Sequence, residues 1–297
     1  MGLVRYTACP VCSSTDLRSV FTVRDFTVSQ EEFGIVECGQ CTVRFTQDVP
    51  DEISISRYYK SEDYISHSDT SRGLVNRLYK MVRGRTLGEK RKLIERITGM
   101  NAGRILDVGS GTGAFLHEMN STGWQVTGLE PDAGAIARAK QLYGLELTET
   151  DRLFSLEAGA FDAITLWHVL EHVHQLHDYM ARLKNLLKEQ GRLVIAVPNY
   201  TAYDERVYRQ FWAAYDVPRH LYHFSPASML ALTKKHGLQI MACRPMWYDS
   251  FYVSLLSSKY KNGSTHWIGA GFAGLLSNIK AIGDTKKCSS VIYIIGR

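Results

Sequence analysis

Residues able to do chemistry gather in a glycine-rich stretch near the middle of the chain. Residues 104–115 read RILDVGSGTGAF, so Asp107 is followed by Gly109, Gly111 and Gly113. Glycines let the backbone approach a ligand closely, and a helix that begins after them offers free N–H groups. The spacing is GxGxG, which differs from the GxGxxG of dinucleotide-binding folds. The stretch predicts a ligand-binding loop at the end of a buried strand.

The elements expected to position this loop follow in a regular order. Apolar runs predict strands that end at Val108 and at Glu130, a less clear third strand at 145–148 before Asp151, and two more at 161–166 and 192–197. Helices are expected at 132–143, with Asp132 as N-cap, and at 175–189, with Gly191 as C-cap. Strands that alternate with helices predict an α/β fold.

Four motifs in this order, DVGSGTG, GLEPD, FDAITLWHVLEHV and LLKEQGRLVIAVPN, resemble those of class I S-adenosylmethionine-dependent methyltransferases. The resemblance implies a Rossmann-like, doubly wound, mostly parallel sheet of seven strands with a late antiparallel strand. It also implies roles for matched positions. Asp107 and the glycines Gly109, Gly111 and Gly113 would hold the methionine end of the cofactor, and Glu130 the ribose hydroxyls. Asp151, Arg152 and Leu153 would border the adenine. Leu166 and His168 would line the pocket near the sulfonium, where His168 is also a catalytic candidate.

Two CxxC pairs lie in the first fifty residues. The pairs are Cys9–Cys12 and Cys38–Cys41, and they are separated by a strand-like stretch around 19–23. Four thiolates at this spacing predict a closed structural zinc site in a small ribbon. The alternative is four reduced cysteines without a metal.

The segment 211–226, FWAAYDVPRHLYHFSP, combines aromatic residues with two histidines. A methyl acceptor needs a proton removed, and histidine suits that task at neutral pH. The run RHLYHFS resembles a segment of sugar methyltransferases, which implies His220 as general base, with His223 as second candidate. Val217, Pro218 and Arg219 depart from the carbon-methylating members, so a hydroxyl of a small molecule or glycan is the expected acceptor.

Residues 72–96 are rich in Lys and Arg. Apolar residues at helical spacing predict an amphipathic helix pair with a solvated basic face, or a dock for an anionic substrate such as RNA. An RNA methyltransferase, binding through the zinc ribbon and this helix, is therefore the alternative function. A non-catalytic module that only senses the cofactor is a further alternative.

Composition bounds these choices. The chain has 297 residues, 45% hydrophobic content, a net charge of +5 and six cysteines. The absence of a long apolar run and of a signal-like start predicts a cytoplasmic protein without a membrane span. The expected domains are a zinc ribbon (1–50), a basic helical cap (51–100) and a methyltransferase domain (101–297). An aromatic insertion at 245–288 leaves a lid, a homodimer contact or a membrane-proximal surface open.

Overall fold

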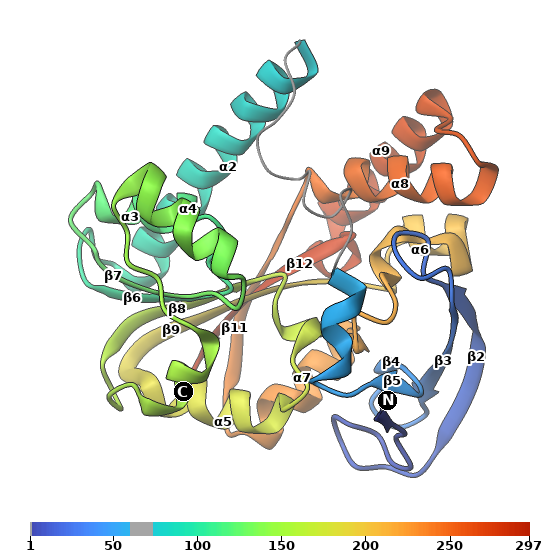
Figure 1. Ribbon diagram of the computed structural model, residues 1–297, viewed down its shortest axis with the longest axis horizontal. Coiled ribbons are helices and arrows are strands. Elements are labelled where there is room, and N and C mark those ends of the chain that lie inside the picture. Colours follow the sequence, from blue (N-terminus) through green and yellow to red (C-terminus); the bar gives the residue numbers. More distant parts are fainter. Residues whose placement is uncertain (1, 60–73) are drawn as a thin grey trace. The chain divides into compact units, whose positions relative to one another are not determined.

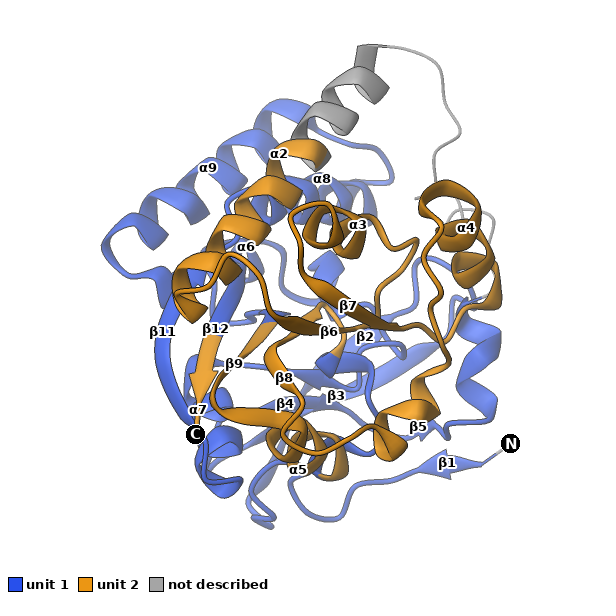
Figure 2. Cartoon of the chain, turned by 90° about the vertical axis from the view of Figure 1, so that its left-hand side faces the viewer, with its two compact units in different colours: residues 1–67, 170–177, 196–293 blue, residues 68–169, 178–195, 294–297 orange. Residues whose placement is uncertain are grey.

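The computed structural model describes residues 2–59 and 74–297 (Figure 1). Within the expected basic cap, residues 60–73 therefore lie outside the described residues, Arg72 among them. The chain divides into two compact units, coloured separately in Figure 2. Unit 1 comprises residues 1–67, 170–177 and 196–293, and unit 2 comprises residues 68–169, 178–195 and 294–297.

Unit 2 contains the strands that precede the predicted ligand loop. β6 (Arg104–Val108) pairs in parallel with β7 (Gln125–Leu129) on one side and with β8 (Phe161–Trp167) on the other. Ile105, Leu106 and Val108 are buried, which explains the apolar run without polar alternation. Parallel strands end at one edge of a sheet, so the loops after β6, β7 and β8 meet there.

The helices of this unit precede, connect or follow those strands. They are α2 (Leu74–Thr98), α3 (Ala114–Asn120), α4 (Ala133–Tyr143) and the larger part of α5 (Leu176–Leu186). The predicted N-cap is confirmed, because the Asp132 carboxylate accepts the backbone N–H of Ala135 at 2.6 Å. The expected helix pair over the basic stretch is wrong in one respect: the described part forms a single helix, α2.

The largest sheet has six strands in the order β11-β12-β9-β8-β6-β7. It adds β9 (Leu187–Pro198), β11 (Gln239–Pro245) and β12 (Ser290–Gly296) to the three strands above. The mixed α/β fold is as predicted, but the seventh strand is not formed among the described residues. The expected third strand is reduced to one parallel bridge between Leu129 and Thr148, after which the chain turns into the short helix η2 (Thr150–Ser155).

Gly191 corrects another expectation. It does not cap a helix but lies inside β9, because α5 already ends at Leu186. A Cβ at this position would lie 2.8 Å from Leu187 Cδ1 and 2.9 Å from the carbonyl oxygen of Phe161. The glycine is therefore required for close strand packing rather than for helix termination.

Unit 1 is built on a four-stranded antiparallel sheet in the order β10-β4-β3-β2. Three strands come from the N-terminal segment, namely β2 (Leu17–Arg24), β3 (Glu32–Cys38) and β4 (Arg44–Thr46). The fourth, β10 (Tyr222–His223), comes from the histidine segment. β1 (Leu3–Val4) pairs with β5 (Val49–Pro50) in a separate ribbon.

Helices complete unit 1. The α-helices are α6 (Tyr203–Tyr208), α7 (Pro226–Lys235), α8 (Asp249–Asn262) and α9 (Trp267–Gly283). Short 3₁₀ helices are η1 (Ser54–Tyr59), η3 (Leu170–His172), η4 (Arg209–Phe211), η5 (Ala213–Tyr215) and η6 (Thr285–Lys287). Aromatic residues such as Tyr58, Trp212 and Tyr215 form a buried cluster with Val23 and Ile35. Among the helices of the described residues, none is long and apolar enough to cross a bilayer.

Candidate functional site

The loop between β6 and α3 has the backbone geometry that its glycines predict. Gly109, Gly111 and Gly113 have φ angles of 74°, 54° and 77°, a region that residues with a side chain rarely adopt. A Cβ on Gly109 would also lie 2.4 Å from Val169 Cγ2. The loop turns directly into α3, whose first N–H groups face the same edge of the sheet.

Asp107 lies buried beneath this loop. Its Oδ1 accepts the hydroxyl of Thr165 from the adjacent strand β8 at 2.5 Å. Burial raises the pKa of Asp107 to about 7, while the hydrogen bond from Thr165 and the positive charge of Lys90 act in the opposite direction. Its protonation state therefore changes near neutral pH, which suits a carboxyl group that binds a cationic ligand group.

Glu130 lies at the end of β7 and is 8% exposed. One carboxylate oxygen accepts the N–H of Gly111 at 2.7 Å and the other accepts that of Asp132 at 3.1 Å. Burial raises the pKa of Glu130, and these two backbone donors lower it. The carboxylate thus ties its own strand to the glycine loop, and its position at the second strand end fits the recognition of vicinal ribose hydroxyls.

The other predicted cofactor residues differ in exposure. Asp151 and Arg152 are exposed in η2, whereas Leu153 is fully buried, so that its side chain belongs to the core. Leu166 is buried near the end of β8 and stands in register with Val108. His168 follows β8 with a φ of 58°, an uncommon conformation for a residue with a side chain.

Two basic residues of α2, Lys90 and Arg91, have partners inside unit 2, whereas Lys92 and Arg96 are exposed. Lys90 Nζ lies 4.1 Å from the centroid of the Trp167 ring. Arg91 forms ion pairs with Glu95 at 2.7 Å and with Glu118 at 2.9 Å. Among the described side chains of this helix, these cations serve to attach the helix to its own unit.

His220 is the central titratable residue of unit 1. Its Nδ1 donates to the carbonyl oxygen of Ala214 at 2.8 Å, which leaves Nε2 as the nitrogen able to accept a proton. Nε2 lies 3.9 Å from Asp216 Oδ2, and the ring stands edge-on to His172 with centroids 4.6 Å apart. The residue is buried but borders other polar groups, as a general base requires.

His172 and Glu171 share this position, in η3. His172 Nδ1 donates to the carbonyl oxygen of Arg219 at 3.1 Å and lies 3.0 Å from the Tyr59 hydroxyl. Burial, with a contribution from His220, lowers the pKa of His172 to about 4, so the ring is neutral at physiological pH. Glu171, His172 and His220 each offer a ligand atom, and these atoms lie within 4.8 Å of one another. Two imidazoles and a carboxylate are a donor set that can hold a divalent cation.

An ion-pair network around Arg219 lies next to Glu171, His172 and His220. Arg219 donates from Nε to Asp216 Oδ2 at 3.0 Å and from Nη2 to Asp25 Oδ1 at 3.0 Å, and the Arg219 side chain is 1% exposed. Burial acts to raise the pKa of both carboxyl groups, but hydrogen bonding and the guanidinium charge outweigh it, and the pKa of Asp25 falls to about 2. The sequence analysis missed Asp25 and Asp216. Only Asp216, four residues before His220, has a sequence signal.

His223 occupies a different environment. It lies in β10 and is 3% exposed, with Nε2 3.1 Å from the Thr46 hydroxyl and its ring edge-on to Tyr215. Burial lowers its pKa well below the usual range for histidine. These contacts are those of a neutral residue in the core of the small sheet.

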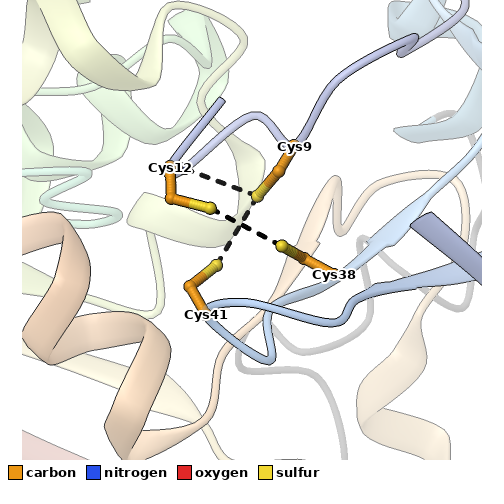
Figure 3. A group of neighbouring side chains, drawn as sticks. All are labelled: Cys9, Cys12, Cys38 and Cys41. Atoms are coloured by element: carbon orange, nitrogen blue, oxygen red, sulfur yellow. Dashed lines mark hydrogen bonds between the residues drawn. The ribbon is translucent and has the colours of Figure 1, made fainter. Parts of the chain in front are cut away.

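The four N-terminal cysteines converge on one point, as Figure 3 shows. The Sγ atoms of Cys9 and Cys41 lie 3.5 Å apart, as do those of Cys12 and Cys38. Zinc–sulfur bonds of about 2.3 Å in a tetrahedron place sulfurs roughly 3.8 Å apart, so the cluster fits the ion closely. The hydrogen bond with Cys41 is the main cause that lowers the pKa of Cys9 to about 5. The backbone N–H groups of Val11 and Cys12 also donate to this sulfur.

The chain is similar to known methyltransferases in sequence and in fold. A family model described as a methyltransferase domain matches residues 82–242, more than half of the chain. Two similar curated proteins are ubiquinone biosynthesis O-methyltransferases. The one from Xanthomonas axonopodis pv. citri is 29% identical over 49% of this chain and 66% of its own length. The one from Nitrosococcus oceani is 31% identical over 54% of this chain and 71% of its own length. The matches thus span about two thirds of these relatives.

Solved structures agree at the level of the fold. Geranyl diphosphate C-methyltransferase from Streptomyces coelicolor A3(2), solved with S-adenosyl-L-homocysteine, aligns with a TM-score of 0.51 and 15% identity over 77% of this chain and 88% of its own. A putative sarcosine dimethylglycine methyltransferase from Galdieria sulphuraria aligns with a TM-score of 0.50 and 14% identity over 71% and 84%. The reported relatives are not named for sugar acceptors, so they leave the expected likeness to sugar methyltransferases without support. The chain belongs to the methyltransferase-domain family, as a class I S-adenosylmethionine-dependent enzyme.

Proposed function

We propose that the protein transfers a methyl group from S-adenosylmethionine to a hydroxyl oxygen of a small molecule or a sugar-like glycan. The similarity to O-methyltransferases supports oxygen as the acceptor atom. The observation that carries the mechanism is the hydrogen bond from His220 Nδ1 to Ala214, because it leaves Nε2 free to take a proton. The sugar-like acceptor is the narrower part of the proposal and rests on the sequence segment RHLYHFS alone.

The cofactor supplies a methyl carbon activated by its positive sulfonium. Asp107 binds the cationic amino end, the glycine loop admits the methionine part, and Glu130 accepts the ribose hydroxyls. Leu166 and His168 border the sulfonium, and Asp151 and Arg152 border the adenine. Leu153 supports that loop from the core, because its side chain is fully buried. Most of the remaining rate acceleration comes from alignment of acceptor and methyl group.

His220 acts on the acceptor. With the methyl donor bound, His220 Nε2 would take the hydroxyl proton as the acceptor oxygen receives the methyl group and S-adenosyl-L-homocysteine leaves. His172 is neutral beside it, and Asp216 stabilises the imidazolium that forms. His223 serves as a positioning residue in the sheet. We also propose that the four cysteines hold a structural zinc ion, with Cys9 already favoured as thiolate.

The RNA alternative receives less support. Its basic helix would have to present cations to phosphate, whereas Lys90 and Arg91 contact Trp167, Glu95 and Glu118 of their own unit. No second function is proposed.

The test is the transfer of labelled methyl groups from S-adenosylmethionine into a fractionated host extract, with His220→Ala and Glu130→Ala run beside the unchanged protein. Label in a nuclease-resistant small-molecule or glycan fraction, lost in both variants, is expected. Alkali-stable label distinguishes an ether from an ester. Label in a nuclease-sensitive fraction contradicts the proposal and favours RNA.

A further inference from the structure

Helix α9 presents its large apolar side chains to solvent. Ile268 is 91% exposed, Phe272 62%, Leu275 46%, Ile279 50% and Ile282 74%. Spacings of four and three residues place all five on one side of the helix. Trp267, 72% exposed, begins the helix. We name this surface, formed by Trp267, Ile268, Phe272, Leu275, Ile279 and Ile282, the apolar stripe.

The opposite side of α9 faces its own protein with small and polar residues. The buried positions are Ala270, Ala273, Gly274, Ser277, Asn278 and Ala281. α8 lies directly beside it (Figure 1), and a Cβ on Gly274 would lie 3.1 Å from the Cα of Phe251. Asn278 accepts the hydroxyl of Ser250 at 2.8 Å and donates to the carbonyl oxygen of Trp247 at 2.8 Å.

These contacts fix the rotation of the helix. Because Gly274 and Asn278 are packed and hydrogen-bonded against α8, the helix cannot turn its large side chains inward. A soluble helix normally buries such residues, so α9 has the polarity of a helix whose outer side is covered by an apolar phase.

The charges around the stripe are mostly positive. Lys259 and Lys261 lie near the end of α8, and Lys286 and Lys287 follow α9, all exposed. Within residues 246–289 the acidic residues are Asp249 and Asp284. Asp284 caps η6 and lies 4.0 Å from Lys287 Nζ. An apolar helix side with an aromatic residue at its start and lysines at its flanks matches helices that lie in the headgroup region of an anionic bilayer.

We propose that the α8–α9 hairpin binds the surface of a membrane containing anionic lipids, with the apolar stripe inserted at the level of the acyl-chain boundary. Charge distinguishes this occupant from a second copy of the chain, because two such hairpins would bring their lysines together. The helix lies along the surface, since no described helix can span a bilayer. The proposal does not depend on the acceptor of the methyl group.

The experiment is co-sedimentation of the full chain with vesicles of phosphatidylcholine alone and of phosphatidylcholine with phosphatidylglycerol. Binding is expected with the anionic vesicles, together with a blue shift of tryptophan fluorescence. Two variants separate the contributions. Ile268→Gln with Ile282→Gln should weaken binding at least tenfold, and Lys286→Gln with Lys287→Gln should remove the preference for anionic lipid.

Met241→Gln is the matched control, because Met241 is 57% exposed on β11 outside the stripe and its loss should leave vesicle binding unchanged. Thermal melting of each variant checks the fold. Absence of binding to both kinds of vesicle overturns the proposal. A dimer in light scattering that the isoleucine variant dissociates, without vesicle binding, also overturns it and assigns the stripe to a second copy.

Discussion

The Nδ1 atom of His220 donates a hydrogen bond to the carbonyl oxygen of Ala214, 2.8 Å away. A carbonyl oxygen can only accept, so this contact fixes the tautomer of the neutral ring. The lone pair is then on Nε2, the atom 3.9 Å from Asp216. Residues 214–220 thus supply both the proposed base and the carbonyl oxygen that orients it.

Replacement of His220 by alanine should lower the turnover number by about 10²–10⁴, the usual contribution of general base catalysis. The dissociation constant of S-adenosyl-L-homocysteine, measured by calorimetry, should stay within about twofold. His266→Ala, at an exposed position of unit 1, should leave both quantities unchanged. Unaltered turnover in His220→Ala would remove the residue from the mechanism.

The unchanged enzyme can be assayed for metal dependence. If Glu171, His172 and His220 hold a divalent cation that activates the acceptor, a chelator added to the unchanged enzyme abolishes turnover and the cation restores it. A direct base role for His220 predicts turnover that the chelator leaves intact at short times. This comparison decides whether His220 acts as a metal ligand or as a general base.

Cofactor binding should depend on pH through Asp107. Its pKa is raised to about 7, so the carboxyl gains charge as the pH rises through neutrality. Affinity for S-adenosyl-L-homocysteine should therefore rise between about pH 6 and 8, and Asp107→Asn should bind weakly with a flattened profile over that range. For folding the sign is opposite: the folded state retains the proton, so stability falls as the pH rises from about 4 to 7. A steep profile in the asparagine variant would exclude Asp107.

The Arg219 network should be essential for the stability of unit 1. Arg219→Met leaves the buried Asp25 and the partly exposed Asp216 without their guanidinium, which should cost about 3–5 kcal/mol in the free energy of unfolding measured with urea. Arg18→Met is the control, because Arg18 and Asp16 form an exposed pair, and it should cost less than about 1 kcal/mol.

The network also predicts that folding stability decreases at low pH. The pKa of Asp25 is depressed to about 2 in the folded state, so its contribution is complete above about pH 4 and is lost as the pH falls toward 2. In Arg219→Met this part of the acid transition should shift to higher pH. Circular dichroism against pH measures the shift, and identical curves for the two proteins would contradict it.

The cysteine cluster should hold one zinc ion per chain, measured by elemental analysis of the purified protein. Cys12→Ser should lower both the zinc content and the melting temperature, because a structural ion stabilises only the folded state. Cys243→Ser, a change at a partly buried thiol outside the cluster, should retain full zinc. Full zinc in Cys12→Ser would show that Cys12 is not a ligand.

The parts of the site that the sequence predicted are those set by local rules. Gly109 predicts a tight loop and Asp132 predicts a helix start, each from a few neighbouring residues. Parallel strands then bring Asp107 and Glu130 to the same edge of the sheet. The residues that contact His220 cannot be predicted from local sequence patterns in this way. Asp25 reaches Arg219 across most of the chain, through tertiary packing that no pattern near either residue records.

The ends of strands and helices are likewise hard to predict from local sequence. The sequence predicts Leu187 to Glu189 as the last turn of a helix, yet they belong to β9, because tertiary structure outweighs local propensity. The orientation of α9 was equally hidden, since an apolar helix can bury either side. The contacts of Gly274 and Asn278 decide which.

Strand β4 follows the second cysteine pair in the chain and pairs with β10 of the histidine segment. Thr46 donates from its hydroxyl to the carbonyl oxygen of His220 at 2.7 Å and from its N–H to that of Leu221 at 2.9 Å. The cysteine-bearing segment is thus hydrogen-bonded to the histidine segment. It cannot be replaced by another zinc-binding segment without changing the surroundings of His220. We expect that oxidation of the four sulfurs would abolish methyl transfer without altering the cofactor loop. The rate of methylation would then depend on the redox state of the cell.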